Sequence, residues 1–195
     1  MNDLLFDLKN ISIPLPGDPQ KLININLKMN KGDLCLIRGS NGAGKSTLLK
    51  WIFKESITQL KLKEKPAYLA QGADDDFILP LQLIEAAQFI NKQYSSTSLT
   101  TNLENINFQK LLPKNIWIRA WNKASLGERQ RSLLAGILES NKGLYLLDEP
   151  TSALDSSSEK IFWQLVNEQM NKGNCFIIVY HGNSNHLPKH QELQL

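Results

Sequence analysis

The hydrophobic residues of the 195-residue chain recur with two periods. Residues 22–29 alternate apolar and polar side chains, which predicts a half-buried strand, and residues 4–13 alternate in part. Together they predict a small antiparallel layer, with a turn at residues 14–19. Three later runs are wholly apolar, which predicts strands buried on both faces, as in a parallel sheet. They are residues 34–37, 144–147 and 175–180.

Between these runs the apolar residues recur at helical spacing. Helices are predicted over residues 45–54, 81–94, 103–122 (one or two short helices), 125–138 and 156–172. The apolar face of the 81–94 helix is expected to hold Leu81, Ile84, Ala87 and Ile90, widened by Leu83 and Phe89. Trp117 and Trp121, four residues apart, are expected on one helical face in the core.

Two further strands are predicted, over residues 66–70 and, at a sheet edge, 191–195. The three acids at 74–76 predict a surface loop, because carboxylates are rarely buried. Strands separated by helices indicate an α/β fold with a mostly parallel sheet. The length and the 42% of hydrophobic residues suit one domain, residues 1–195.

A glycine-rich loop lies between the apolar run 34–37 and the helix expected from Lys45. This order of strand, loop and helix predicts a phosphate-binding loop for a nucleoside triphosphate. Glycines let the backbone N–H groups turn toward one anion, Lys45 supplies a positive charge, and Ser46 offers a hydroxyl to Mg²⁺. The nucleotide-binding residues are predicted to be Gly39, Ser40, Asn41, Gly42, Ala43, Gly44, Lys45, Ser46 and Thr47.

Polar residues also follow the other predicted strands. Asp148 is expected to hold Mg²⁺ together with Ser46, and Glu149 to polarise a water for attack on the γ-phosphate. His181 follows a buried strand and is expected to contact the γ-phosphate, and Gln71 follows the 66–70 strand. Ligands of open α/β sheets bind at such strand ends.

The net charge, the cysteines and the lack of long apolar runs indicate which partners and which compartment to expect. The net charge is only +3, without a clustered basic stripe, so no nucleic-acid partner is expected. Cys35 and Cys175 lie in apolar runs and are expected to be small buried hydrophobes. No signal segment or run of about 20 apolar residues appears, so we expect a cytoplasmic protein whose membrane role requires another chain.

The combined motifs resemble the nucleotide-binding subunit of an ATP-binding-cassette (ABC) transporter over about residues 4–181. The matching pieces are Gly39–Ser46, Gln71, Ser125–Arg131, Leu144–Glu149, Ser152–Asp155 and His181. The resemblance implies a P-loop NTPase with a RecA-like core and an N-terminal antiparallel β layer. It also implies an α-helical subdomain inserted at about residues 72–125.

The resemblance further implies partners and roles. Two copies would form a head-to-tail homodimer with two ATP molecules at its interface. Ser125 and Gly127, within the signature Ser125-Leu126-Gly127-Glu128, would contact the γ-phosphate held by the other subunit. Asp155 would couple the two sites, and Gln71 would sense Mg²⁺ and the attacking water. The inserted subdomain would bind separate transmembrane permease subunits at the cytoplasmic face of the membrane.

The sequence departs from the family pattern at three places. The signature usually reads Leu-Ser-Gly-Gly-Gln, so Leu126 replaces a glycine and needs a backbone conformation that an L-residue tolerates; a slower site is expected. Residues 13–16 lack the usual adenine-stacking aromatic, which would relax the preference for ATP over GTP. The chain ends soon after His181, which resembles small haem-exporter or lipoprotein-releasing cassettes, whereas residues 71–80 resemble metal importers.

Two other functions are compatible with the motifs. A soluble ABC ATPase of DNA repair or translation usually shows a coiled-coil insertion or two cassettes in one chain, and neither is present here. A nucleotide switch with little hydrolysis is disfavoured because Glu149 supplies a base. A transport ATPase is therefore the favoured interpretation, although neither the transported substrate nor the direction of transport is encoded in these motifs.

Overall fold

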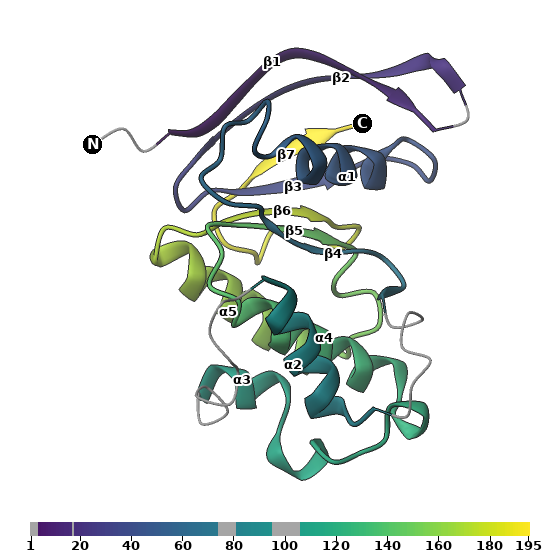
Figure 1. The fold of residues 1–195 in the computed structure, drawn as a ribbon, viewed down its shortest axis with the longest axis vertical. Helices are drawn as coiled ribbons and strands as arrows, with labels where there is room; N and C mark the ends of the chain where they lie inside the picture. The colour runs from purple at the N-terminus through teal and green to yellow at the C-terminus, as the bar shows by residue number, and fades with distance from the viewer. Residues whose placement is uncertain (1–3, 17, 74–80, 95–105) are drawn as a thin grey trace. The chain divides into compact units, whose positions relative to one another are not determined.

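The computed structural model of the chain describes residues 4–16, 18–73, 81–94 and 106–195. The chain divides into two compact units (Figure 1). The sheet unit comprises Met1–Ala70, Gly143–Glu149 and Asn167–Leu195, and the helical unit comprises Gln71–Lys142 and Pro150–Val166.

An antiparallel pair of long strands begins the sheet unit. β1 (Leu4–Leu15) pairs with β2 (Asp18–Asn30), which confirms the predicted antiparallel layer. Residues 23, 25, 27 and 29 of β2 are buried and residues 22, 24, 26 and 28 are exposed, as the alternation predicts. β1 alternates only in part because its register shifts beside Asn10, whose φ is 51°. The predicted turn at 14–19 is wrong in extent, since both strands run into it.

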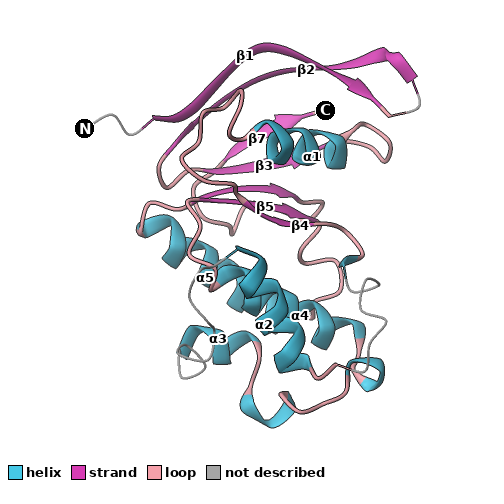
Figure 2. Ribbon diagram, viewed as in Figure 1, coloured by secondary structure: helices cyan, strands magenta, loops and turns pink. Residues whose placement is uncertain are grey.

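Five parallel strands form the second sheet of this unit, in the order β4-β5-β6-β3-β7, as labelled in Figure 1 and drawn in magenta in Figure 2. Their bounds are β3 Leu34–Arg38, β4 Ala67–Leu69, β5 Leu144–Asp148, β6 Cys175–Val179 and β7 Gln191–Gln194. β5 and β6 are buried along their whole length and β3 as far as Ile37, which confirms the strands predicted from the apolar runs. β7 is the predicted edge strand.

One face of the parallel sheet packs against helix α1 (Lys45–Glu55) and the inner residues of β1 and β2. Every second residue of the three central strands joins Leu48, Leu49 and Ile52 of α1 in one hydrophobic cluster. The contributing strand residues are Cys35, Ile37, Leu144, Leu146, Cys175, Ile177 and Val179. Burial raises the pKa of Cys35 to about 12 and also raises that of Cys175, so both thiols stay protonated. Their predicted role as buried hydrophobes is confirmed.

The helical unit is built around the contact of α2 (Leu83–Tyr94) with α4 (Leu126–Leu138). The Ser132 hydroxyl donates to the Leu83 carbonyl, and Asn91 Nδ2 donates to the Gly136 carbonyl at 3.3 Å. The remaining helical segments are α3 Ile106–Leu111, η3 Lys114–Ile116, η4 Trp121–Lys123 and α5 Ser156–Asn171, of which α5 continues into residues of the sheet unit. Among the described residues, every helix is too short or too polar to span a lipid bilayer.

Two details of the predicted helices are wrong. The buried face of α2 consists of Leu83, Ala86, Ala87, Ile90 and Asn91, so the face is rotated from the predicted one and Phe89 is 52% exposed. Trp117 and Trp121 do not share a helical face, because η3 ends before Trp117 and the extended residue Ala120 separates it from η4. Trp121 is buried, whereas Trp117 lies at the surface edge with its indole N–H bonded to the Leu112 carbonyl. The acids at 74–76 lie outside the described residues.

Gly136 allows α2 and α4 to approach closely, and its substitution gives a test of this packing. A Cβ at Gly136 would lie 2.3 Å from the Ala87 carbonyl oxygen, so Gly136→Ala should lower the free energy of unfolding by about 1–3 kcal/mol. A Cβ at Gly143 would meet nothing within 4 Å, so Gly143→Ala should be neutral or stabilising by about 0.4–1 kcal/mol. Urea unfolding of both variants measures the difference. Equal stability of the two would contradict the close approach.

Candidate active site

Three neighbouring strands end at the same edge of the parallel sheet. In the register, Val179 of β6 lies beside Asp148 of β5 on one side and beside Ile37 of β3 on the other. The segments that follow these strands are therefore adjacent at their carboxyl ends. They are the loop from Gly39, the pair Asp148–Glu149 and the turn at His181, so the structure brings these predicted residues together.

Three glycines of the loop have a positive φ, and two are also required by packing. A Cβ at Gly39 would lie 2.7 Å from the Leu195 carbonyl oxygen, and one at Gly44 would lie 2.3 Å from Ile23 Cδ1. Gly42 meets nothing within 4 Å but has a φ of 79°. Glycine is thus favoured at all three positions by conformation. Packing against β2 and the chain end adds a second reason at Gly39 and Gly44.

Lys45 begins α1, and its ammonium group is held inside the loop. Nζ donates to the carbonyl oxygens of Gly39 at 3.0 Å and Ser40 at 2.9 Å, and the residue is buried. The N–H groups of the first turn of a helix have no partner within the helix, and the dipole adds positive potential there. A buried cation and a helix start therefore face the same loop, which favours binding of an anion.

Asp148 is a buried carboxylate at the end of β5. Its Oδ1 atom accepts no hydrogen bond from any described residue, and the residue is 3% exposed. Burial raises the pKa of Asp148, and a hydrogen bond from the Ser46 hydroxyl opposes that rise. The positive charges of Lys50 and Lys45 also oppose it. An orphaned carboxylate oxygen beside a serine hydroxyl suits a hard divalent cation such as Mg²⁺.

The small number of side chains that could ligate a metal ion here suits a Mg²⁺ ion that is held partly by the phosphates of a nucleotide. The described residues contain no group of three or more His, Cys, Asp or Glu side chains placed to hold a metal ion. Mg²⁺ is commonly bound by one or two carboxylates together with phosphates of a substrate. Ser46 and Asp148 fit this pattern.

Glu149 and His181 lie in contact. His181 Nε2 is 3.1 Å from Glu149 Oε1, and the two side chains are 47% and 22% exposed. Glu149 has a φ of 50°, a left-handed conformation that is uncommon for a residue with a long side chain. Such backbone strain is concentrated at functional positions in proteins. In this conformation the Glu149 side chain contacts His181, which follows β6.

The signature segment lies in the helical unit and starts α4 with a capping box. Ser125 Oγ accepts the N–H of Glu128 at 3.2 Å, and Glu128 Oε2 accepts the N–H of Ser125 at 3.0 Å. Glu128 also pairs with Arg119. Desolvation acts to raise the pKa of Glu128, but the bonds from Ser125 and Arg119 outweigh it and lower the pKa. Glu128 is therefore ionised at neutral pH.

Leu126 and Gly127 lie between Ser125 and Glu128, and their surroundings explain why the first of them need not be a glycine. Leu126 is the first residue of α4, has no positive φ and is 57% exposed, so its backbone suits an L-residue as expected. A Cβ at Gly127, in contrast, would lie 2.7 Å from the Ala153 carbonyl oxygen. Glycine is thus sterically required at 127 and not at 126.

Asp155 and Gln71 also belong to the helical unit. The Asp155 carboxylate accepts hydrogen bonds from the Ser157 hydroxyl, from the Ser158 N–H at 2.8 Å and from the Ser158 hydroxyl at 3.0 Å. These bonds, led by that of Ser157, hold the pKa of Asp155 well below its usual range. Gln71 lies in an exposed turn after β4. The roles predicted for Gln71, Asp155 and the signature segment stay predictions.

The sequence motifs did not single out Arg38. Its guanidinium group contacts the backbone on both sides of His181, at the carbonyl oxygens of Tyr180 and Gly182. The available signal was a single charged residue at the end of an otherwise apolar strand, directly before Gly39.

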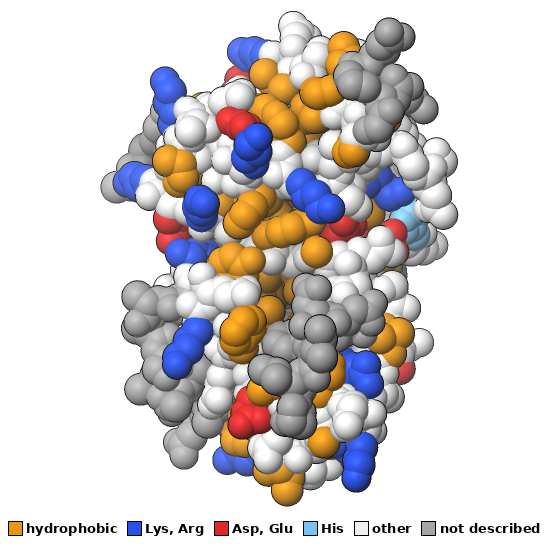
Figure 3. Space-filling view, turned by 45° about the vertical axis from the view of Figure 1, so that its right-hand side comes forward, with side chains coloured by type: hydrophobic (Ala, Val, Ile, Leu, Met, Phe, Trp, Pro, Cys, Tyr) orange, Lys and Arg blue, Asp and Glu red, His pale blue; other side chains and the backbone are white. Residues whose placement is uncertain are grey.

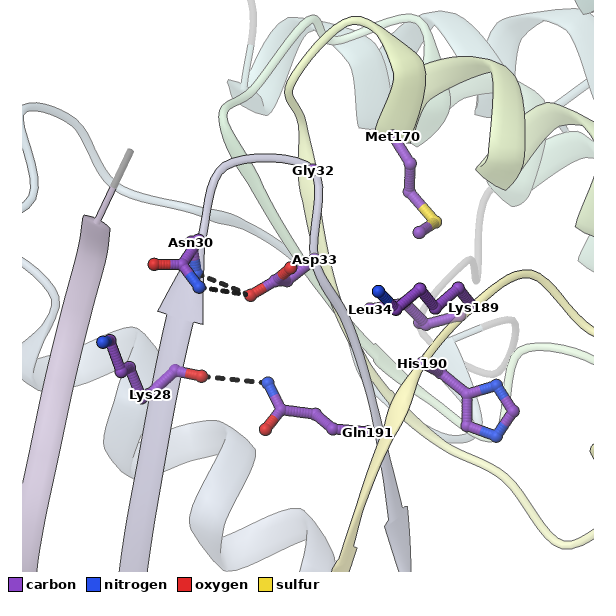
Figure 4. A pocket seen from close by; sticks show the side chains of 9 residues that line it. All are labelled: Lys28, Asn30, Gly32, Asp33, Leu34, Met170, Lys189, His190 and Gln191. Carbon is purple, nitrogen blue, oxygen red and sulfur yellow. Dashed lines mark hydrogen bonds between the residues drawn. The ribbon is translucent and has the colours of Figure 1, made fainter. Parts of the chain in front are cut away.

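A separate cavity of about 410 Å³ lies at the opposite, amino end of β3 (Figure 4). Its polar side chains bond to neighbouring groups: Asp33 Oδ2 accepts from Asn30 N at 2.7 Å, and Gln191 Nε2 donates to the Lys28 carbonyl at 2.9 Å. It contains none of the predicted site residues. On the face drawn in Figure 3, the described Lys and Arg side chains are scattered among hydrophobic and uncharged ones.

Comparison with known families and proteins gives consistent matches. The family model described as "ABC transporter" matches residues 22–152. The zinc import ATP-binding protein ZnuC of Haemophilus influenzae is 31% identical over 180 residues, covering 90% of this chain and 65% of that protein. The energy-coupling factor transporter ATP-binding protein EcfA2 of Methanospirillum hungatei is 28% identical over 203 residues, covering 91% of this chain and 49% of that protein. The chain thus spans less than two thirds of the length of both relatives.

Solved structures share the fold. A putative ABC transporter ATP-binding protein of Pyrococcus furiosus superposes with a TM-score of 0.72 at 20% identity, covering 97% of this chain and 96% of that one. An ATP-binding cassette in a dimeric, post-hydrolysis state bound to ADP and Pi superposes with a TM-score of 0.71 at 22% identity, covering 90% and 88%. The predicted P-loop α/β fold is confirmed.

Asp148→Asn tests whether the buried carboxylate is kept for a cation at the cost of stability. Without nucleotide, the variant should be more stable by on the order of 1 kcal/mol, because a buried charge with an orphaned oxygen is removed. The gain should shrink as the pH falls. The raised pKa means that folded Asp148 takes up a proton at a higher pH than the unfolded chain does.

Thermal unfolding with and without Mg²⁺ and ATP measures both effects. Mg²⁺ should add to the stabilisation by ATP in the wild type and add little in the variant. The cation assignment is wrong if Mg²⁺ and ATP stabilise Asp148→Asn as much as the wild type.

Proposed function

Because the chain belongs to the ABC transporter family, we propose that it binds and hydrolyses ATP as the subunit that powers a membrane transporter. The observation that carries the proposal is the meeting of three segments at the ends of β3, β5 and β6. They supply a phosphate loop, a cation-binding carboxylate and a glutamate in contact with a histidine. Together these are the parts that phosphoryl transfer to water requires.

The loop residues bind the triphosphate. The Lys45 ammonium exchanges its bonds to the Gly39 and Ser40 carbonyls for bonds to the β- and γ-phosphates, and the first-turn N–H groups of α1 add donors. Ser46 and Asp148 are the residues proposed to hold Mg²⁺, which would neutralise phosphate charge when bound. Residues 13–16 contain no aromatic side chain that could stack on the base, which should relax the preference for ATP over GTP.

Glu149 is the general base for hydrolysis. Its carboxylate accepts a proton from a water in line with the γ-phosphate, while the water oxygen bonds to phosphorus and the bond to the β-phosphate oxygen breaks. ADP and inorganic phosphate are the products. His181, 3.1 Å from Glu149, holds the carboxylate and contacts the γ-phosphate.

The site is completed by a second copy of the chain. Ser125 accepts a backbone N–H at its own helix start, which leaves its hydroxyl proton to donate to a γ-phosphate held by the partner. The positive end of the α4 dipole supports the same contact. ATP thus favours the closed homodimer and hydrolysis favours the open one, with Asp155 coupling the two sites.

The proposed membrane partner is a set of separate transmembrane permease subunits. The helical subdomain at about residues 72–125 would dock on them, so that the chain lies at the cytoplasmic face of the membrane. Phe89 and Ile118, which are 52% and 77% exposed in the helical unit, suit such a contact. One relative is named a zinc import ATP-binding protein and another an energy-coupling factor transporter ATP-binding protein, which supports the proposed link between ATP binding and transport.

Glu149→Gln tests hydrolysis directly. Turnover at saturating ATP should fall by about 10²- to 10⁴-fold with ATP affinity unchanged, because the variant keeps the shape and loses the base. Glu64→Gln, an exposed glutamate of the sheet unit, is the matched control and should hydrolyse ATP as the wild type does. A wild type as slow as Glu149→Gln would instead support the weakly hydrolysing switch.

The composite site predicts a dependence on protein concentration. At low concentration the rate of ATP hydrolysis should rise as the square of the protein concentration, since only the dimer holds complete sites. Glu149→Gln with ATP should double its molar mass by light scattering and remain monomeric without nucleotide. A rate strictly proportional to concentration, together with a monomer in ATP, would contradict the dimer.

A further inference from the structure

Arg38 is a charged residue at the end of a buried strand. β3 is buried from Leu34 to Ile37, and the side chain of Arg38 is only 16% exposed. One terminal nitrogen, Nη1, donates to the Tyr180 carbonyl at 2.8 Å and to the Gly182 carbonyl at 2.7 Å. These carbonyls belong to the residues on either side of His181. A single guanidinium nitrogen therefore holds the backbone before and after the histidine.

The other edge of the guanidinium group is fixed as well. Nη2 and Nε lie 3.2 and 3.4 Å from Glu192 Oε1 on β7, and the group lies over the Tyr180 ring at 5.1 Å from its centroid. The Ser184 hydroxyl donates to the same Glu192 oxygen at 2.9 Å. That bond, with Arg38 and His190, lowers the pKa of Glu192. Arg38 is thus held by an ionised partner in one orientation.

The turn around His181 is compact and leaves little room for another arrangement. A Cβ at Gly182 would lie 2.2 Å from the Tyr180 hydroxyl oxygen, so this glycine packs against the ring that Arg38 covers. Arg38 also directly precedes Gly39, the first residue of the phosphate loop. Its backbone sets the start of the loop while its side chain holds the His181 turn.

We propose that Arg38 is a positioning residue for His181: it clamps the carbonyls of Tyr180 and Gly182 so that the imidazole stays at Glu149. This inference rests on the proposed hydrolysis at the same site. An exposed ion pair alone would contribute little to holding the turn. Arg38, in contrast, is largely buried, and its planar guanidinium group bonds to two backbone carbonyls, which fixes the geometry of the turn. Lysine lacks the planar fork and the ring contact, so charge without that shape should not replace Arg38.

Steady-state kinetics separate positioning from phosphate binding. Arg38→Met should lower kcat for ATP hydrolysis by about 10- to 100-fold, as expected when a reacting group is misplaced by about an ångström, with KM changed less than about threefold. Arg38→Lys should recover only part of kcat. Lys9→Met, which removes a cation from an exposed ion pair on β1, is the control and should behave as the wild type. An effect on KM alone, or full recovery by lysine, would overturn the proposal.

A double variant shows whether Arg38 acts through His181. Arg38→Met combined with His181→Gln should be no slower than His181→Gln alone, because the clamp has nothing left to position. Losses that simply multiply would mean that Arg38 acts elsewhere, which contradicts the proposal.

A measurement that does not depend on hydrolysis completes the test. The chain has three histidines, so the ring ¹³C–¹H signals of His181 can be assigned by their loss in His181→Gln. Arg38→Met, or Arg38→Lys if the first variant does not fold, should shift the His181 signals and leave those of His186 in place.

The two failures are distinguishable. If wild-type protein hydrolyses no ATP while Arg38→Met moves the His181 signals, the proposed function fails and the clamp stands. If the wild type hydrolyses ATP and neither the His181 signals nor kcat changes in Arg38→Met, the positioning role is wrong.

Discussion

The alignment of three parallel strands is the constraint on which the sheet-unit site depends. β3, β6 and β5 are paired so that Ile37, Val179 and Asp148 lie side by side, and the segments after them diverge from one edge. The strands can be aligned in this way because their apolar side chains alternate between two covered faces. A slip of one residue in β5 would exchange buried Leu146 and Leu147 between the faces and move Asp148 away from Ser46. Core packing and site geometry are therefore set by the same hydrogen-bond register.

The sheet-unit part of the site could be predicted from sequence because its residues directly follow recognisable strands. Apolar runs locate β3, β5 and β6, and the glycine spacing locates the loop. Details that depend on tertiary contacts could not be predicted in this way. The face of α2 is fixed by Gly136 and Ser132 of α4, which override the apolar count that favoured Phe89. Arg38 was missed because its acceptors are backbone carbonyls, which leave no trace in side-chain patterns.

The signature segment shows how a motif can vary where sterics allow. Leu126 stands in ordinary helical backbone with its side chain exposed, whereas Gly127 lies against the Ala153 carbonyl. Glu128 keeps the capping box intact, and Arg119 balances the charge that the usual glutamine would not carry. The helix start that would face a phosphate is therefore formed by local bonds within the helical unit, and its apolar first residue should reduce access of water to the anion.

The left-handed backbone at Glu149 has an evolutionary consequence. A residue with a Cβ pays roughly 1–2 kcal/mol for this conformation, and glycine or asparagine adopts it more readily. Random substitution followed by selection for thermal stability alone would therefore enrich glycine or asparagine at position 149. On the proposed role of Glu149 as general base, glutamate would be retained only in cells that are also selected for ATP-dependent work. The backbone angle at this position would then be kept for chemistry at a cost in stability.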